Sequence, residues 1–279
     1  MKTKVFIIKR ESHETTQDVV LRTLKIIPLK KLITNSEIKI LINPNWVTSD
    51  HFSTGNVTST DTLEGILIYL IQNADIDPKK IIVADGGSFG TSEKFFKLNE
   101  VFRLEEYGVN IMNLNNDETI NDIEISNPLA LKTVNIAKTA IEASCIISVP
   151  SLKTHNLAIT TLSMKNMMGT IMPKSIMHTN IHKKITDLIS VLRSKMKFQI
   201  IDGIIGSNGW ELGGKPIQMD VIIAGEDPVA VDRVGSAIMG YGPDKVKYLK
   251  YGEEKQLGTA NLEDIEIIGK QISEVYHKF

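Results

Sequence analysis

The sequence predicts an α/β fold with a mainly parallel central sheet and helices on both of its faces. Short apolar runs alternate along the chain with longer segments in which apolar residues recur at the spacing of a helix face. Strands that alternate with helices pair in parallel, because each helical crossover returns the chain to the same end of the sheet. Several apolar runs also end in polar loops, which is typical of strands that stop at a ligand-binding edge.

Composition favours one large globular domain. The chain has 279 residues, of which 42% are hydrophobic and 23% are charged. We expect a single α/β domain over residues 1–279, with a small β subdomain near 107–136, where the sequence is mostly polar. The net charge of −1 gives no electrostatic reason to expect nucleic acid or an anionic membrane as a partner. No apolar run is long enough for a transmembrane helix, and the first one is too short for a signal peptide, so we expect a cytoplasmic protein.

The first half of the chain is predicted to form strands that are each followed by a helix. Val19, Val20 and Leu24 recur at helical spacing in the first helix. Asp61 is predicted to be the N-cap of the second helix, because a carboxylate accepts the free N–H groups of a first turn. The expected elements are a strand at 4–9, a helix at 15–27, a strand at 38–42, a helix at 61–71, a strand at 80–84 and a helix at 91–104.

The second half continues this alternation. Asp227 is predicted to be an N-cap, with Pro228 at the first helical position, where its missing N–H costs nothing. Residues 203–214 are rich in glycine, which predicts a loop that is flexible or closely approached. The expected elements are a short helix at 139–143, a strand at 145–149, a helix at 181–192, strands at 198–201 and 221–224, helices at 229–239 and 243–257, and a closing strand at 265–268.

One central segment, Cys145–Asp187, concentrates the polar residues that suggest a site. Its apolar strand is expected to stop at Pro150, which has no N–H for strand pairing, and to release a cationic loop with Lys153 and His155. A second Ser-x-Lys follows at Ser163 and Lys165. Asn166, His178 and His182 come next, so this segment holds half of the six histidines. The lone cysteine excludes internal disulfides, and its apolar surroundings predict an inert core residue.

These residues carry a family resemblance. Lys-Thr-His after a strand is followed by Ser-Met-Lys-Asn-Met-Met-Gly, a histidine, Asp202-Gly203 and the run Glu-Asp-Pro-Val-Ala-Val-Asp at 226–232. In this order they resemble the bacterial and archaeal family known as domain of unknown function 362, roughly from Ile40 to Gly240. The resemblance implies the fold and the location of the site but names no reaction. Some relatives are joined to iron–sulphur ferredoxin modules, which implies a redox partner protein; one cysteine cannot itself hold a four-cysteine cluster, so no iron–sulphur cluster is expected in this chain.

The main functional hypothesis is an enzyme that acts on a small anionic molecule bearing a phosphate or carboxylate. The loops at 43–45, 85–87 and 151–153 all follow expected strands, so in a parallel sheet they meet at one edge. Lysines hold such anions as point charges. The expected catalytic residues are His155, as a general acid or base because an imidazole titrates near neutrality, and Asp202. The expected ligand-binding residues are Asn45, Asp85, Lys153, Lys165, Asn166, His178 and Asp227.

Two alternatives remain open on the sequence alone. His178 and His182 are four residues apart, so on a helix both would face one way and could bind a divalent metal, with His155 or Asp187 completing the set. The second alternative is a non-catalytic ligand-binding protein or partner subunit, because no complete catalytic set is evident. Lys165 carries the sharpest expectation: together with Asn166 it interrupts an apolar run, so it is expected to face a cavity rather than bulk solvent.

Overall fold

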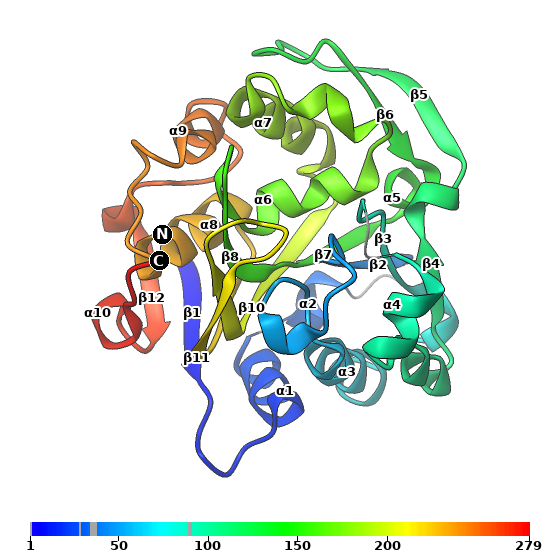
Figure 1. Cartoon of the computed structure of the whole chain (residues 1–279), viewed down its shortest axis with the longest axis vertical. Coiled ribbons are helices and arrows are strands. Elements are labelled where there is room, and N and C mark those ends of the chain that lie inside the picture. Colours follow the sequence, from blue (N-terminus) through cyan, green and yellow to red (C-terminus); the bar gives the residue numbers. More distant parts are fainter. Residues whose placement is uncertain (1, 28, 34–37, 89–90) are drawn as a thin grey trace.

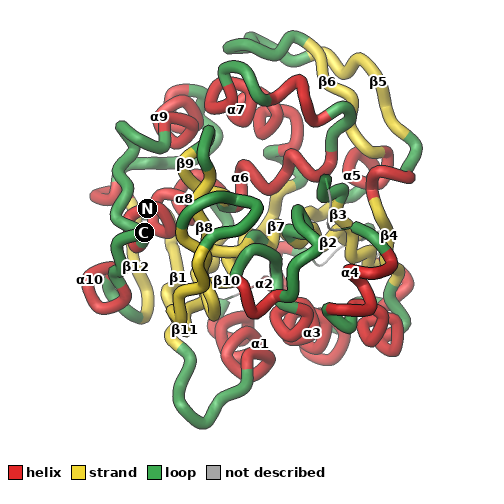
Figure 2. Tube along the Cα trace, viewed as in Figure 1, coloured by secondary structure: helices red, strands yellow, loops and turns green. Residues whose placement is uncertain are grey.

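The structure, a computed structural model, describes residues 2–27, 29–33, 38–88 and 91–279. A central sheet lies between two layers of helices (Figures 1 and 2). The described part of the chain forms a main sheet of ten strands and a separate pair, β5 and β6. In sheet order the main strands are β12 (Ile265–Gly269), β1 (Thr3–Lys9), β11 (Lys215–Gly225), β10 (Met196–Asn208), β7 (Cys145–Val149), β2 (Ile40–Pro44), β3 (Ile81–Asp85) and β4 (Asn110–Asn113), with β8 (Ser151–His155) and β9 (Ile159–Thr161) attached to β10 through β8.

Strand direction in the main sheet is mostly parallel. The neighbours β10, β7, β2, β3 and β4 all pair in parallel, as do β1 with β12 and β8 with β10. The exceptions are β11, which is antiparallel to both of its neighbours, and β9, which is antiparallel to β8. The predicted α/β fold with a mainly parallel sheet is therefore confirmed.

Helices cover both faces of this sheet (Figure 1). One face packs against α1, α3 and α4, and the other against α5 to α9. The helices are α1 (Thr16–Ile26), α2 (Leu29–Leu32), α3 (Thr60–Ile68), α4 (Glu93–Leu98), α5 (Lys138–Glu142), α6 (Ser163–Asn166), α7 (Ile181–Leu192), α8 (Pro228–Ile238), α9 (Lys247–Glu254) and α10 (Ile272–Val275). No helix in these described ranges is long and apolar enough to cross a membrane.

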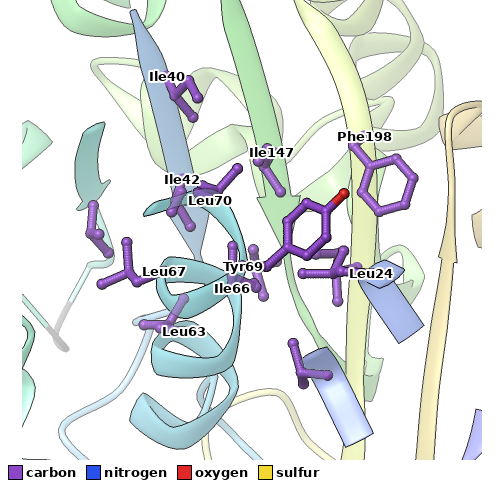
Figure 3. Close-up of a cluster of buried hydrophobic side chains, with 14 of the residues drawn as sticks. Leu24, Ile40, Ile42, Leu63, Ile66, Leu67, Tyr69, Leu70, Ile147 and Phe198 are labelled. Atoms are coloured by element: carbon purple, nitrogen blue, oxygen red, sulfur yellow. The ribbon is translucent and has the colours of Figure 1, made fainter. Parts of the chain in front are cut away.

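The two layers follow from side-chain alternation along the buried strands. In β2, Ile40 and Ile42 point to the α1–α3 face, whereas Leu41 belongs to the core on the other face. Figure 3 shows α3 laid across these strands, with its apolar side chains against Ile42 and Ile147 and with Phe198 and Leu24 closing the cluster. Truncating such a buried side chain to alanine costs about 2–5 kcal/mol of stability.

Helix boundaries correct two sequence expectations. The N-cap of α3 is Ser59, whose side chain accepts a hydrogen bond from the Asp61 N–H, so the predicted Asp61 cap was wrong. Asp61 instead lies in the first turn and forms an ion pair with Arg103. The helix expected at 91–104 is broken into α4 and a 3₁₀ helix at 101–107, because Glu100 adopts a left-handed backbone conformation with φ of 52° that an α-helix cannot continue through.

Strand lengths also differ from expectation. The stretch expected as a loop after Pro150 is strand β8, which finds its own partners in β10 and β9. Strands β10 and β11 run much further than the apolar runs at 198–201 and 221–224, because they stay paired as one long antiparallel hairpin out to Asn208 and Lys215. The glycine-rich loop is thereby confined to 209–214. The segment 107–136 divides: β4 joins the edge of the main sheet, and β5 (Thr119–Glu124) pairs with β6 (Thr133–Ala137) outside it.

Candidate functional site

A cavity of about 320 Å³ opens at the carboxyl ends of β2 and β3. Parallel α/β sheets bind ligands at this edge, because loops from several strands meet there. The lining comes from the β2 and β3 loops, the end of β8, the region of α6 and the β10–β11 loop. Its residues are Asn45, Val47, Asp85, Gly86, Gly87, Ser88, His155, Lys165, Asn166, Met168, Gly169, Lys174, His178, Glu211 and Leu212.

The floor of the cavity depends on close packing between Asp85 and Gly169. A Cβ atom added to Gly169 would lie 1.8 Å from Asp85 Oδ1, so only glycine fits opposite this carboxylate. Asp85 is buried and accepts the Trp46 N–H at 2.7 Å. Burial raises the pKa of its carboxyl group, while the hydrogen bonds from the Trp46 and Gly86 backbone oppose that rise.

A chain of three amides fixes which atom Asn45 offers to a ligand. Asn166 Nδ2 donates to the backbone oxygen of Asn43 at 2.9 Å, which leaves Asn166 Oδ1 as an acceptor. Asn45 Nδ2 donates to that oxygen at 2.9 Å. Asn45 Oδ1 is consequently turned away from this bond, and it is buried without a hydrogen-bond partner among the described residues. An unpaired buried acceptor costs stability unless a ligand or water satisfies it.

Lys165 is a cation that lines the cavity. It lies on α6, is half-buried, and its Nζ has no hydrogen bond or ion pair with any residue that the structure describes. Burial lowers the pKa of this amine to about 8, and the negative charges of Glu211 and Asp85 limit the fall. At neutral pH the side chain is therefore still mostly protonated and is available to an anion.

Two other lysines near the cavity are already occupied. Lys153 is 1% exposed and does not line the cavity; its Nζ donates to the Asn56 backbone oxygen at 2.6 Å and to that of Glu211 at 3.4 Å. Burial, followed by the charge of Lys165, lowers the pKa of Lys153 to about 7. Lys174 does line the cavity, but it donates to Asn115 Oδ1 at 2.7 Å. Lys165 is thus the lysine of this group with its ammonium uncommitted.

His155 has a defined tautomer and is neutral. Its Nδ1 accepts the N–H groups of Leu157 and Ala158 at 3.1 and 3.2 Å, so the ring proton is on Nε2, which lies 3.6 Å from Glu211 Oε1. Burial, with the charges of Lys165 and Lys153 behind it, lowers the pKa of the imidazole to about 2. The pKa near neutrality that was expected for His155 as a general acid or base is therefore wrong. His155 offers a neutral Nε2–H donor to the cavity.

Two of the expected aspartates lie away from the cavity and have structural hydrogen bonds. Asp202 accepts the Ser59 N–H at 2.9 Å in the buried connection before α3. Asp227 caps α8 as expected, accepting the Val229 N–H at 2.8 Å, and it borders a different hollow near the start of β1. The structure therefore does not bring Asp202 or Asp227 together with Lys165.

The two histidines proposed as a metal pair are not on one helix. His178 precedes α7, His182 lies in its first turn, and Asn180 between them has a left-handed φ of 54°. His178 lines the cavity, whereas His182 Nδ1 accepts the Tyr248 N–H at 3.3 Å. Asp187 is fully buried, where it accepts three backbone N–H groups and contacts Lys255. The described ranges contain no group of three or more His, Cys, Asp or Glu residues that could hold a metal ion.

Glu211 and Lys174 line the cavity but were not among the site residues expected from the sequence. Glu211 belongs to the β10–β11 loop, and its Oε2 also accepts the Asn156 N–H at 3.0 Å, which ties this loop to the end of β8. A carboxylate alone within a glycine-rich loop was the available signal for Glu211. Lys174 follows Pro173 inside the same central segment as the other cations, but nothing local distinguishes it from a solvated lysine.

Two of the motifs that carry the family resemblance, the first at 163–169 and the second at 226–232, are joined by hydrogen bonds. Asp232, from the second motif on α8, accepts the backbone N–H groups of Ser163 and Met164 at 2.7 and 2.9 Å. These groups begin α6, so Asp232 fixes the start of the helix that carries Lys165 and Asn166. Asp232 is fully buried, and this burial raises the pKa of its carboxyl group to about 7 despite both hydrogen bonds. The second motif thus positions the first.

Comparisons with known proteins agree with the fold. A solved structure titled as that of the lactate racemase apoprotein from Thermoanaerobacterium thermosaccharolyticum matches with a TM-score of 0.55 and 17% sequence identity. The match covers 86% of this chain but 57% of that one, so this chain spans little more than half of its length. At this identity the likeness shows the α/β fold alone. No curated protein matches the sequence. Residues 40–237 match the family described as Domain of unknown function (DUF362), and the chain belongs to that family.

Proposed function

We propose that the protein is an enzyme that acts on a small molecule bearing a carboxylate or phosphate, held in the cavity at the carboxyl ends of β2 and β3. The observation that carries this proposal is Lys165, a half-buried ammonium that faces the cavity with no partner in the described ranges. Keeping a cation desolvated and unpaired costs stability, and an anionic ligand would recover that cost through a charged hydrogen bond.

The neighbouring groups select what else the ligand carries. Asn45 Oδ1 is a buried acceptor without a partner, so it favours a hydroxyl or amine hydrogen on the ligand. His155 presents Nε2–H, which favours an acceptor such as a carbonyl or a second carboxylate oxygen. The ligand class that satisfies all three groups is a small acid with both a hydrogen-bond donor and an acceptor close to its anionic group.

The similarity in fold to a solved structure suggests one compound for the ligand screen. The matching solved chain is titled a lactate racemase apoprotein, and lactate is a small hydroxycarboxylate. At 17% identity we carry no reaction from it to this chain, but lactate belongs in any ligand panel. The redox partner that the family resemblance implies stays a prediction, as does a cytoplasmic location.

A ligand screen followed by a turnover assay tests this proposal. Thermal-shift measurements should compare small carboxylates, hydroxycarboxylates and phosphates with uncharged analogues of the same size, and a carboxylate or phosphate should raise the melting temperature most. Each hit is then incubated with catalytic amounts of protein and followed by NMR in D₂O for conversion or hydrogen exchange. A panel in which no anion stabilises the protein would overturn the proposed ligand class, and hits that are bound but never converted would overturn the enzyme.

His155→Asn gives a matched variant for the turnover assay. The asparagine oxygen can accept the two backbone N–H groups that Nδ1 accepts now, so the local turn is kept while the Nε2–H donor is lost. We expect conversion of the hit to fall by at least about tenfold with an unchanged melting temperature. Unchanged turnover in this variant would remove His155 from the reacting site.

A further inference from the structure

A second hollow of about 300 Å³ adjoins the first, and His178 lines both. It lies at the start of α7 and faces α9. Its wall combines the apolar surfaces of Leu157 and Tyr251 with His182, Lys183 and Lys247. Because His178 belongs to both hollows, one ligand that extends past this side chain would touch both.

The charge in this second hollow has one sign. Neither Lys183 nor Lys247 forms a hydrogen bond or ion pair with a residue in the described ranges, and no carboxylate lines the hollow. The charge of Lys247 acts on His182, where it adds to burial in lowering the pKa of that imidazole. Uncompensated like charges around one concave surface attract an anion, because each cation gains a counter-charge that the protein does not supply.

Two neighbouring lysines, by contrast, form hydrogen bonds or an ion pair within the protein. Lys184, next to Lys183, donates to Thr179 Oγ1 at 2.9 Å and also to the Ile176 backbone oxygen. Lys255, just after α9, forms an ion pair with Asp187 at 3.2 Å. Lys183 lies on α7 and Lys247 on α9, but neither has such a contact with a residue that the structure describes.

We propose that the second hollow binds a second anionic group of the same ligand, so that the substrate is an elongated molecule with an anionic group at each end. One end is held by Lys165, and the other lies between Lys183 and Lys247. The linking carbons pass His178 and lie against Leu157 and Tyr251. This proposal rests on the proposed function, because it assumes that the first anion occupies the cavity beside Lys165. It narrows the substrate class to dicarboxylates, bisphosphates or phosphorylated acids.

Chain length is the variable that tests this geometry. Two series serve as probes, the α,ω-dicarboxylates from malonate to suberate and the α,ω-bisphosphonates of the same lengths, each compared by calorimetry with the singly charged acid of equal length. We expect the doubly charged probes to bind better above a threshold length, with a maximum gain of about tenfold, the sum of two partly exposed ion pairs. The gain should shrink at high salt, since exposed charges are screened.

The double variant Lys183→Met/Lys247→Met should bring the ratio of the two affinities at the best length back to about one. Lys250→Met is the matched control, because Lys250 lies on α9 but outside the hollow, and it should leave the ratio unchanged. If singly charged acids bind but no length of doubly charged probe gains affinity, Lys183 and Lys247 are surface lysines only and the subsite is overturned while the proposed function stands. If neither series binds, the doubly charged substrate class is overturned, and the ligand screen with hydroxycarboxylates and phosphates decides the proposed function separately.

Discussion

Lys165→Met separates a lysine that binds a ligand from one that supports the fold. The substitution keeps an unbranched side chain of similar bulk but removes the ammonium, which has no partner in the described ranges. If the ammonium donated hydrogen bonds within the protein, its removal would leave their acceptors unpaired, and the protein would become less stable. An ammonium kept for a ligand leaves none, so its loss should weaken ligand binding and stabilise the free protein.

The size of the stability gain follows from the pKa. Burial lowers the pKa of Lys165 from 10.5 to about 8, so holding it charged at neutral pH costs at most about 3 kcal/mol. Water in the cavity screens part of this cost, and we expect a gain of about 1–2 kcal/mol. For a chain of this size that corresponds to a rise of about 2–8 °C in melting temperature. The loss in affinity for an anionic ligand should be about 1.5–3 kcal/mol, the worth of a charged hydrogen bond.

The assay pairs thermal unfolding of the free protein with calorimetry on the best anion from the ligand screen. Lys94→Met is the control, because Lys94 is exposed on α4 and does not line the cavity, and both quantities should stay at the wild-type value. A drop in melting temperature would show that Lys165 supports the fold. Equal affinity of wild type and Lys165→Met would refute the assignment of the anion to this side chain.

Three further predictions follow from the same structure. Anion affinity should be constant below pH 7 and fall about tenfold per pH unit above pH 8, because deprotonation of Lys165 removes the charge; a flat calorimetric profile from pH 6 to 10 would contradict this. Asp187→Ala should cost about 3–5 kcal/mol in urea unfolding, since three buried N–H groups and a lysine lose their acceptor, and a loss below about 1 kcal/mol would show that they find other partners. Gly169→Ala should abolish anion binding by displacing Asp85, whereas Gly213→Ala, whose added methyl group has nothing within 4 Å, should bind normally in the same titration.

The proximity of several cavity residues follows from the direction of the strands alone. Parallel strands end at one edge, so residues after β2 and β3 were expected beside those of the central segment. The structure has Asn45, Asp85, Lys165, Asn166 and His178 around one cavity. Their functional roles stay predictions, but their proximity is a consequence of strand direction. The sequence also shows that Lys165 and Asn166 are polar residues within an otherwise apolar run.

The hydrogen-bond partners of the buried lysines and aspartates could not be predicted in this way. Lys153 and Lys165 share a Ser-x-Lys context, but the first is buried against the Asn56 backbone oxygen and the second faces the cavity. Asp202 follows an apolar run as a site residue would, but its carboxylate accepts the Ser59 N–H. These differences depend on partners far away in sequence, which no local pattern records.

The sequence by itself determined the fold class and the edge of the sheet at which the polar loops meet, because apolar periodicity and strand ends are set by near neighbours along the chain. Only the tertiary structure decided which cations remain free, which tautomer His155 adopts, and that Glu211 reaches the cavity. Those properties arise when segments distant in sequence come within hydrogen-bond distance and lose their water, so they are set by packing rather than by local sequence.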